Sequence, residues 1–301
     1  MKKTILLTAL FLTIIGCQKD EVNETSTPKT MTARDSAVYN YNEVYLKTNL
    51  TNSGWTGNIL TCNAGTIPTT THEMVAKRIN YFRNLVGLPK IEMDLSTDKV
   101  KACQEAAFMM HANNKLSHFP TSDWKCYTAD GYLGATKSNL SIGYNSTTAI
   151  SNLIQDAGTT NAPVGHRRWL LYSKAKSFTS GSTGYTSAVW VHSDFAIKNS
   201  KEFTAYPHRY FPQNLVYNRW SFSIYGAIFN DAKVVMTGPS GNVALSIVSN
   251  SGPAYGDNTI VWEPTGIVKN STEDVKYTVT VSGIKNASKT SYTYEVIIIK
   301  P

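Results

Sequence analysis

Two histidines in short polar motifs are the side chains of this 301-residue sequence best suited to chemistry. His118 stands in the motif Ser-His-Phe-Pro, and His166 stands in the run Gly-His-Arg-Arg-Trp-Leu-Leu. An imidazole titrates near neutral pH, so two of them in one cleft can exchange protons with a substrate or bind a divalent metal. His118 and His166 are therefore the candidate catalytic residues and the candidate metal ligands.

A metal site needs more ligands than these two histidines. Zinc takes three or four ligands, and Asp156, ten residues before His166, is the nearest carboxylate by position. Asp156 is thus the third candidate catalytic residue, but the set falls short of a zinc signature. We expect no cofactor and keep zinc as the alternative. The interpretation we prefer is that both imidazoles form hydrogen bonds in a polar cleft.

The sequence offers no clear nucleophile. Ser138 is followed directly by Asn139 and lacks a Gly-x-Ser-x-Gly elbow. Cys103 lies among alanines in a helical pattern, where a small thiol is expected to be buried and unreactive. Hydrolysis is therefore the less favoured function.

Two arginines follow His166. Arg167 and Arg168 can bind an anion at a helix start or pair with a carboxylate. We favour a pair between one of them and Asp156, with the other in solvent. The next residues, from Trp169 to Leu171, are expected to be core.

Helices are expected to position these motifs. Val75, Ile79 and Phe82 recur at helical spacing after a capping box of Thr70 and Glu73. The pattern also predicts the following elements: helices over 96–113 and 148–156, a helical turn after Pro163, and a strand over 187–192. A mixed α/β region therefore carries both histidines.

After about Pro207 the pattern changes to short strands separated by turns rich in Gly, Pro, Ser and Asn. Six strands are predicted, over 220–224, 233–237, 243–248, 259–262, 277–282 and 292–299. This spacing is typical of an antiparallel β-sandwich. Trp220, Trp262 and Tyr277 are expected to lie in its core.

Four motifs in order resemble the CAP superfamily of cysteine-rich secretory, antigen 5 and pathogenesis-related proteins. They are Asn-Tyr-Phe-Arg from Asn80, Leu-Ser-His-Phe from Leu116, Ser-Asn-Leu from Ser138 and Gly-His-Arg from Gly165. The resemblance covers roughly residues 62 to 200 and implies an α/β/α sandwich. With the strand-rich tail, it points to a bacterial lipoprotein subgroup in which an Ig-like domain follows the CAP domain.

The resemblance also implies a shallow cleft with two histidines and two acidic residues. His118 and His166 match the histidines, whereas Ser138 stands where the family has a glutamate. Asp156 is the nearest match to the second acidic position. The expected ligand cleft consists of the following residues: His118, Ser138, Asn139, Asp156, His166 and Arg167.

The N-terminus resembles a bacterial lipoprotein leader. A short positive start is followed by an apolar run over 5–15 and then by Gly16 and Cys17. We expect cleavage before Cys17 and lipidation of its thiol, with an uncleaved anchor as the alternative. The segment Gln18–Glu21 resembles the export signal of surface lipoproteins. The expected location is therefore the outer membrane, facing the cell surface or the periplasm.

The expected order is a signal peptide over 1–16, a tether over 17–58, a CAP domain over 59–207 and an Ig-like sandwich over 208–301.

With Cys17 lipidated, three cysteines remain, so at most one disulfide forms. Because Cys103 lies in a helix, we predict a bond between Cys62 and Cys126.

The net charge of +8 is scattered, with no run of Lys or Arg longer than two, which argues against nucleic-acid binding. We expect a monomeric, non-enzymatic surface lipoprotein that binds a small apolar, glycan or protein ligand in the cleft. The alternative is a secreted hydrolase of peptides or cell-envelope material that uses His118 and His166.

Overall fold

A computed structural model describes residues 31–192, 195 and 202–301. The expected signal peptide, Cys17 and Gln18–Glu21 lie outside these residues. Within them, no helix is long and apolar enough to cross a membrane.

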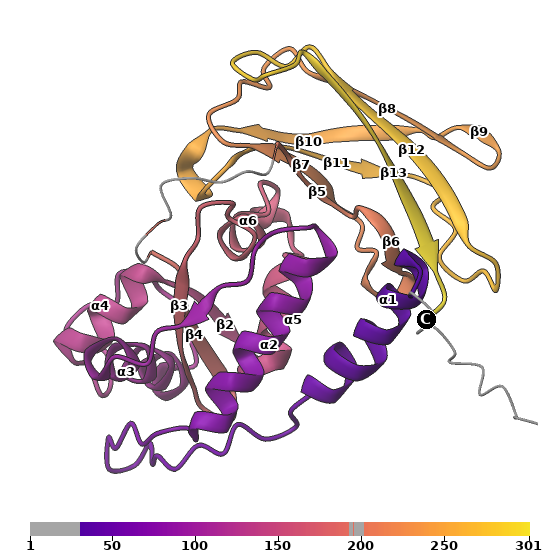
Figure 1. Ribbon diagram of the computed structural model, residues 1–301. Helices are drawn as coiled ribbons and strands as arrows, with labels where there is room; N and C mark the ends of the chain where they lie inside the picture. Colours follow the sequence, from indigo (N-terminus) through magenta and orange to yellow (C-terminus); the bar gives the residue numbers. More distant parts are fainter. Residues whose placement is uncertain (1–30, 193–194, 196–201) are drawn as a thin grey trace, which may run out of the picture. The chain divides into compact units, whose positions relative to one another are not determined.

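The first region is a three-layer α/β/α arrangement (Figure 1). Its sheet has the strand order β1-β3-β4-β2, with β1 parallel to β3 and the other pairs antiparallel. Helices α2 and α5 cover one face of the sheet, and α3 and α4 cover the other. The bounds are β1 Glu92–Met93, β2 Ser138–Ile142, β3 Ser177–Ser182, β4 Thr186–Trp190, α2 Thr69–Leu85, α3 Thr97–Asn113, α4 Ala129–Lys137, α5 Ser146–Gln155, η3 Thr159–Asn161 and α6 Gly165–Leu170.

Small residues let α3 lie directly on the sheet. A Cβ at Gly181 of β3 would lie 2.3 Å from the Cys103 carbonyl carbon, and one at Gly134 of α4 would lie 2.1 Å from the Ala102 oxygen. Ala106 and Ala107 are fully buried between these elements. The predicted helices are present, but the capping box of Thr70 and Glu73 is not, because α2 begins earlier, after Pro68.

Two sheets form the C-terminal region, in the orders β10-β11-β7-β5 and β6-β13-β12-β8-β9. Buried and exposed residues alternate along β12 and β13, as expected for strands with one face on a core. Trp220, Trp262 and Tyr277 are buried, as predicted. The bounds are β5 Thr204–Tyr206, β6 Arg209–Pro212, η4 Gln213–Leu215, β7 Trp220–Ile224, β8 Lys233–Gly238, β9 Gly241–Asn242, β10 Leu245–Ser251, η5 Pro253–Tyr255, β11 Asn258–Pro264, β12 Val275–Ser282 and β13 Ser291–Ile299.

Among the described residues this β-sandwich has nine strands where six were predicted, and it differs from the prediction in two further respects. One pair, β13 with β6, is parallel. The strand β5, which ends at Tyr206, already pairs with β7, so the strand-rich region begins before residue 208.

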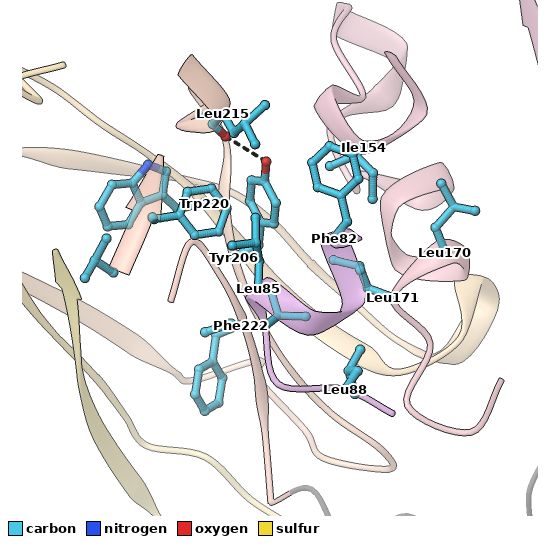
Figure 2. Close-up of a cluster of buried hydrophobic side chains, with 14 of the residues drawn as sticks. Phe82, Leu85, Leu88, Ile154, Leu170, Leu171, Tyr206, Leu215, Trp220 and Phe222 are labelled. Carbon is cyan, nitrogen blue, oxygen red and sulfur yellow. Dashed lines mark hydrogen bonds between the residues drawn. The ribbon is translucent and has the colours of Figure 1, made fainter. Parts of the chain in front are cut away.

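The two regions share one hydrophobic core (Figure 2). Phe82 of α2 and Ile154 of α5 belong to the same buried cluster as Trp220 and Phe222 of β7. Tyr206 lies in this cluster and donates its hydroxyl to the Leu215 carbonyl at 2.7 Å. Residues 32–301 accordingly form one compact unit.

The segment over 32–58 is not the tether that the sequence predicted. It begins with α1 Ala33–Asn40, followed by the helical turns η1 Tyr41–Tyr45 and η2 Leu46–Thr48. Arg34 forms a bidentate ion pair with Asp274, with both contacts at 2.8 Å. Arg78 of α2 donates to the Thr48 hydroxyl at 2.8 Å. These contacts depend on residues distant in sequence, so a search for local periodicity does not find them.

The predicted disulfide is confirmed. Cys62 and Cys126 are joined, and Cys103 is free and buried in α3. The bond fastens the segment before α2 to the loop between α3 and α4.

Candidate functional site

His118 and His166 line the same cavity, whose volume is about 370 Å³. The other walls come from the start of β2, the end of β4, the η3–α6 segment and η5 of the β-sandwich. The remaining lining residues are Phe119, Thr136, Ser138, Asn139, Thr160, Asn161, Pro163, Gly165, Trp169, Val191, His192, Ala254 and Tyr255.

His166 is held on two sides. Asp156 ends α5 in a left-handed conformation, with φ of 51°. Its carboxylate accepts the His166 backbone N–H at 2.9 Å and lies 2.8 Å from the ring Nδ1. Asn139 of β2 donates its side-chain amide to the His166 carbonyl at 3.0 Å.

These contacts fix the tautomer of His166. A carboxylate only accepts hydrogen bonds, so Nδ1 carries the hydrogen and Nε2 is the nitrogen available to a ligand. The Asp156 side chain is fully buried, whereas the His166 side chain is 27% exposed. Asp156 therefore stands behind His166 and orients it, and it does not line the cavity.

His118 is oriented in the same way by the backbone. It follows α3 on an exposed loop, and its Nδ1 lies 2.9 Å from the Ala135 carbonyl of α4. Since a carbonyl also only accepts, Nε2 is again the available nitrogen. The cavity thus contains two imidazoles that both use Nδ1 to contact the protein.

Ser138 supplies neither a charge nor a nucleophile. It is buried at the start of β2, and its hydroxyl lies 4.0 Å from the Cys103 sulfur. Burial raises the pKa of the Cys103 thiol to about 12, so the thiol stays protonated and unreactive. This burial of Cys103 agrees with the expectation from the sequence.

The arginines do not behave as predicted. Arg167 is buried and donates through its guanidinium to the carbonyls of Ile154 and Arg219, at 2.6 and 2.8 Å. Arg168 is also buried and donates to the Asp257 carbonyl. Of the groups of these two arginines, the Asp156 carboxylate accepts only the backbone N–H of Arg167. Neither guanidinium therefore pairs with Asp156, and both arginines are buried. Both arginines tie the helical region to the β-sandwich, and Arg167 does not line the cavity.

The cavity includes residues that the sequence did not indicate. His192 lies just past β4, with its ring 4.4 Å from that of Trp169. Burial, followed by the nearby Lys137 and His118, lowers the pKa of His192. Trp169, expected to be core, is only half-buried. The register of β4 against β2 brings His192 here, and only the three-dimensional pairing reveals it.

The described residues, 31–192, 195 and 202–301, place no three of His, Cys, Asp and Glu together so that they could hold a metal ion. The two imidazoles and the buried Asp156 do not fit a zinc site, because Asp156 uses its carboxylate on His166 and Arg167.

Residues 76–191 match the family model described as CAP, cysteine-rich secretory protein family. No curated protein and no solved structure matches the chain.

Proposed function

We propose that this protein, whose residues 76–191 match the CAP family model, binds a ligand noncovalently in the cavity around His118 and His166. The observation that carries the proposal is that the two imidazoles of this cavity are oriented in the same way. Both histidines line it, and both use Nδ1 to contact the protein, which leaves Nε2 for a ligand. Hydroxyl and amide side chains surround them, as in a site that orients a ligand by a few polar contacts.

A specific observation favours a second candidate, the hydrolase. A buried carboxylate 2.8 Å from a partly exposed imidazole can help His166 accept a proton from water. The arrangement otherwise lacks parts for catalysis. Ser138 lines the cavity with a buried hydroxyl and offers no carboxylate, and burial keeps the Cys103 thiol protonated. Binding therefore accounts for more of the site than catalysis does.

The proposed location is the outer membrane, where lipidated Cys17 would anchor a monomeric protein facing the cell surface or the periplasm. The disulfide between Cys62 and Cys126 supports export, because such bonds persist in oxidising compartments. Labelling cells with a radioactive fatty acid tests the anchor. Label on the wild type and none on Cys17→Ala is expected, and equal labelling of both would overturn it.

The binding proposal is tested by native mass spectrometry of the full chain purified from its own envelope. We expect a bound molecule on the wild type that is lost from the double variant His118→Ala/His166→Ala. The control is His111→Ala, because His111 lies outside the cavity, between Trp55 and Tyr185. Retention of the molecule by the double variant would overturn the proposal.

The same proteins separate binding from hydrolysis. Wild type, the double variant and the control are incubated with casein and with purified cell-envelope polymer, and the products are analysed by mass spectrometry. Products released by the wild type and the control but not by the double variant would establish the hydrolase instead.

A further inference from the structure

A loop of the β-sandwich forms one wall of the cavity that His118 and His166 line. Ala254 and Tyr255, in η5 between β10 and β11, line the same cavity as His118 and His166. The matched CAP residues end at 191, more than sixty positions earlier. The site is therefore built from both regions of the chain.

Buried polar contacts fix this loop against α6. Arg168 donates Nε and Nη2 to the Asp257 carbonyl at 3.2 and 2.9 Å, and Nη2 also donates to the Gly252 carbonyl. The Asp257 carboxylate accepts the Ser173 N–H at 3.1 Å and the Ser173 hydroxyl at 2.8 Å. Because Arg168, Asp257 and Ser173 are all buried, the loop is anchored on both sides of Tyr255.

Two glycines allow the loop to come this close. A Cβ at Gly165 would lie 3.0 Å from Cδ1 of Tyr255, so the tyrosine ring rests on the backbone next to His166. Gly256 has φ of +91°, and a Cβ there would lie 3.1 Å from Cδ2 of Tyr172. Tyr255 is thus held at the edge of the cavity as a residue that is 40% exposed, with the Arg168 guanidinium carbon 5.3 Å from the centroid of its ring.

The cavity combines accessible aromatic rings with uncharged hydrogen-bonding groups. Phe119 is 71% exposed and Tyr255 is 40% exposed, and both line it together with half-buried Trp169. Thr136, Thr160 and Asn161 line the same cavity. Among the described residues, no Asp, Glu, Lys or Arg lines the cavity.

This chemistry fits a sugar ring better than other ligands. The C–H face of a pyranose stacks on an aromatic ring, and its hydroxyls require donors and acceptors at the ring edge. Among the described residues, no Arg or Lys lines the cavity to balance the charge of an anionic ligand, and the guanidiniums of Arg167 and Arg168 lie outside its lining. An acyl chain would leave the polar lining without partners. We infer that η5 completes the cavity, which binds a neutral saccharide with a pyranose ring stacked on Tyr255.

This inference rests on the proposed function, that the cavity binds a ligand noncovalently. The test applies the purified full chain to an array of neutral and acidic glycans and measures the strongest ligand by calorimetry. We expect neutral glycans to bind. Tyr255→Ala should weaken this binding about tenfold or more, and Tyr255→Phe, which keeps the ring, should change it less than about threefold.

Two further variants test whether binding depends on an aromatic ring at position 255. Tyr255→Leu keeps apolar volume without a ring and should lose as much affinity as Tyr255→Ala, with an unchanged circular dichroism spectrum. Tyr185→Ala is the matched control, because Tyr185 is 41% exposed and does not line the cavity. Absence of neutral-glycan binding, or binding insensitive to Tyr255→Ala, would overturn the inference. If the co-purified molecule still depends on His118 and His166 but not on Tyr255, the proposed function stands and only this inference fails.

Discussion

The carboxylate of Asp156 holds both the backbone and the ring of His166. It accepts the backbone N–H at 2.9 Å and the Nδ1 hydrogen at 2.8 Å, and it also receives the Arg167 N–H at 3.3 Å. One buried side chain at the end of α5 therefore sets both the position of α6 and the tautomer of its histidine. The fold and the site depend on the same carboxylate.

Replacing Asp156 should consequently lower the stability of the folded protein. Asp156→Ala leaves buried N–H groups without an acceptor, and we expect a loss of about 2–4 kcal/mol in the free energy of unfolding. Asp156→Asn keeps one acceptor oxygen and should lose less. Urea unfolding followed by tryptophan fluorescence measures the free energy of unfolding of both variants.

The control for this prediction is Asp130→Ala. Asp130 forms an exposed ion pair with Lys101, and such pairs contribute at most about 1 kcal/mol. Equal urea midpoints for Asp156→Ala and the wild type would show that the carboxylate does not support α6.

The shared core predicts that the two regions unfold together. Phe82 of the helical region and Trp220 of the β-sandwich belong to one buried cluster, and Arg168 adds hydrogen bonds across the junction. We expect one calorimetric transition for the full chain. Arg168→Met should lower its midpoint, because the carbonyls of Gly252 and Asp257 lose their donor. Two separate transitions in the wild type would contradict a common core.

The disulfide should contribute strongly to stability because it closes a long loop. Cys62 and Cys126 are 64 positions apart, and the chain-entropy model gives about 4 kcal/mol for a loop of that length. Cys62→Ser/Cys126→Ser should lose about this amount in urea unfolding under oxidising conditions. The wild type with added reductant should match the variant. A difference below about 1 kcal/mol would mean that the loop is constrained by its other contacts.

Local patterns predicted the helices α2, α3, α5 and α6, the strand β4 and most strands of the tail, but not α1, α4 or the strands β1 and β3. Val75, Ile79 and Phe82 mark α2, and the alternating residues of the tail mark most of its strands. The pairing of Cys62 with Cys126 followed because Cys103 fits a helix of small residues. These inferences succeeded because each depends on neighbours a few residues apart.

Contacts between distant residues limited the prediction of the site. His192 and Tyr255 reach the cavity through the register of β4 and the anchoring of η5, and neither has a local motif. The arginines were assigned wrongly because a sequence shows possible charge partners but not the carbonyls of Ile154 or Asp257. The helix α1 is a different case, because Thr32 and Asp35 form a capping box at its start, which is a local signal that the tether prediction passed over.

A buried histidine outside the cavity should make stability depend on pH. His72 of α2 is buried, and its Nδ1 lies 2.9 Å from the Ser180 hydroxyl. Burial disfavours the charged imidazole, so the pKa of His72 is lowered. The folded protein therefore binds this proton less tightly than the unfolded chain does.

Because the unfolded chain binds this proton more tightly, stability falls as the pH is lowered. Above an unfolded pKa of about 6.5, both states carry a neutral imidazole, and stability is complete. As the pH falls below about 6.5, the unfolded chain takes up a proton first, so each such group lowers the free energy of unfolding by at most about 1.4 kcal/mol per pH unit. Desolvation also lowers the pKa values of His111 and His192, but both side chains are partly exposed, so solvent screening makes their effect on stability smaller than that of His72.

Urea unfolding at pH 7.5 and pH 5.5 measures how much of the pH dependence of stability comes from His72. His72→Asn removes the titrating group, so this variant should lose less stability between the two pH values than the wild type does. Ser180→Ala, which removes the hydrogen bond but keeps the imidazole, should retain the wild-type pH dependence. If His72→Asn loses as much stability as the wild type over this interval, protonation of His72 does not drive the acid sensitivity.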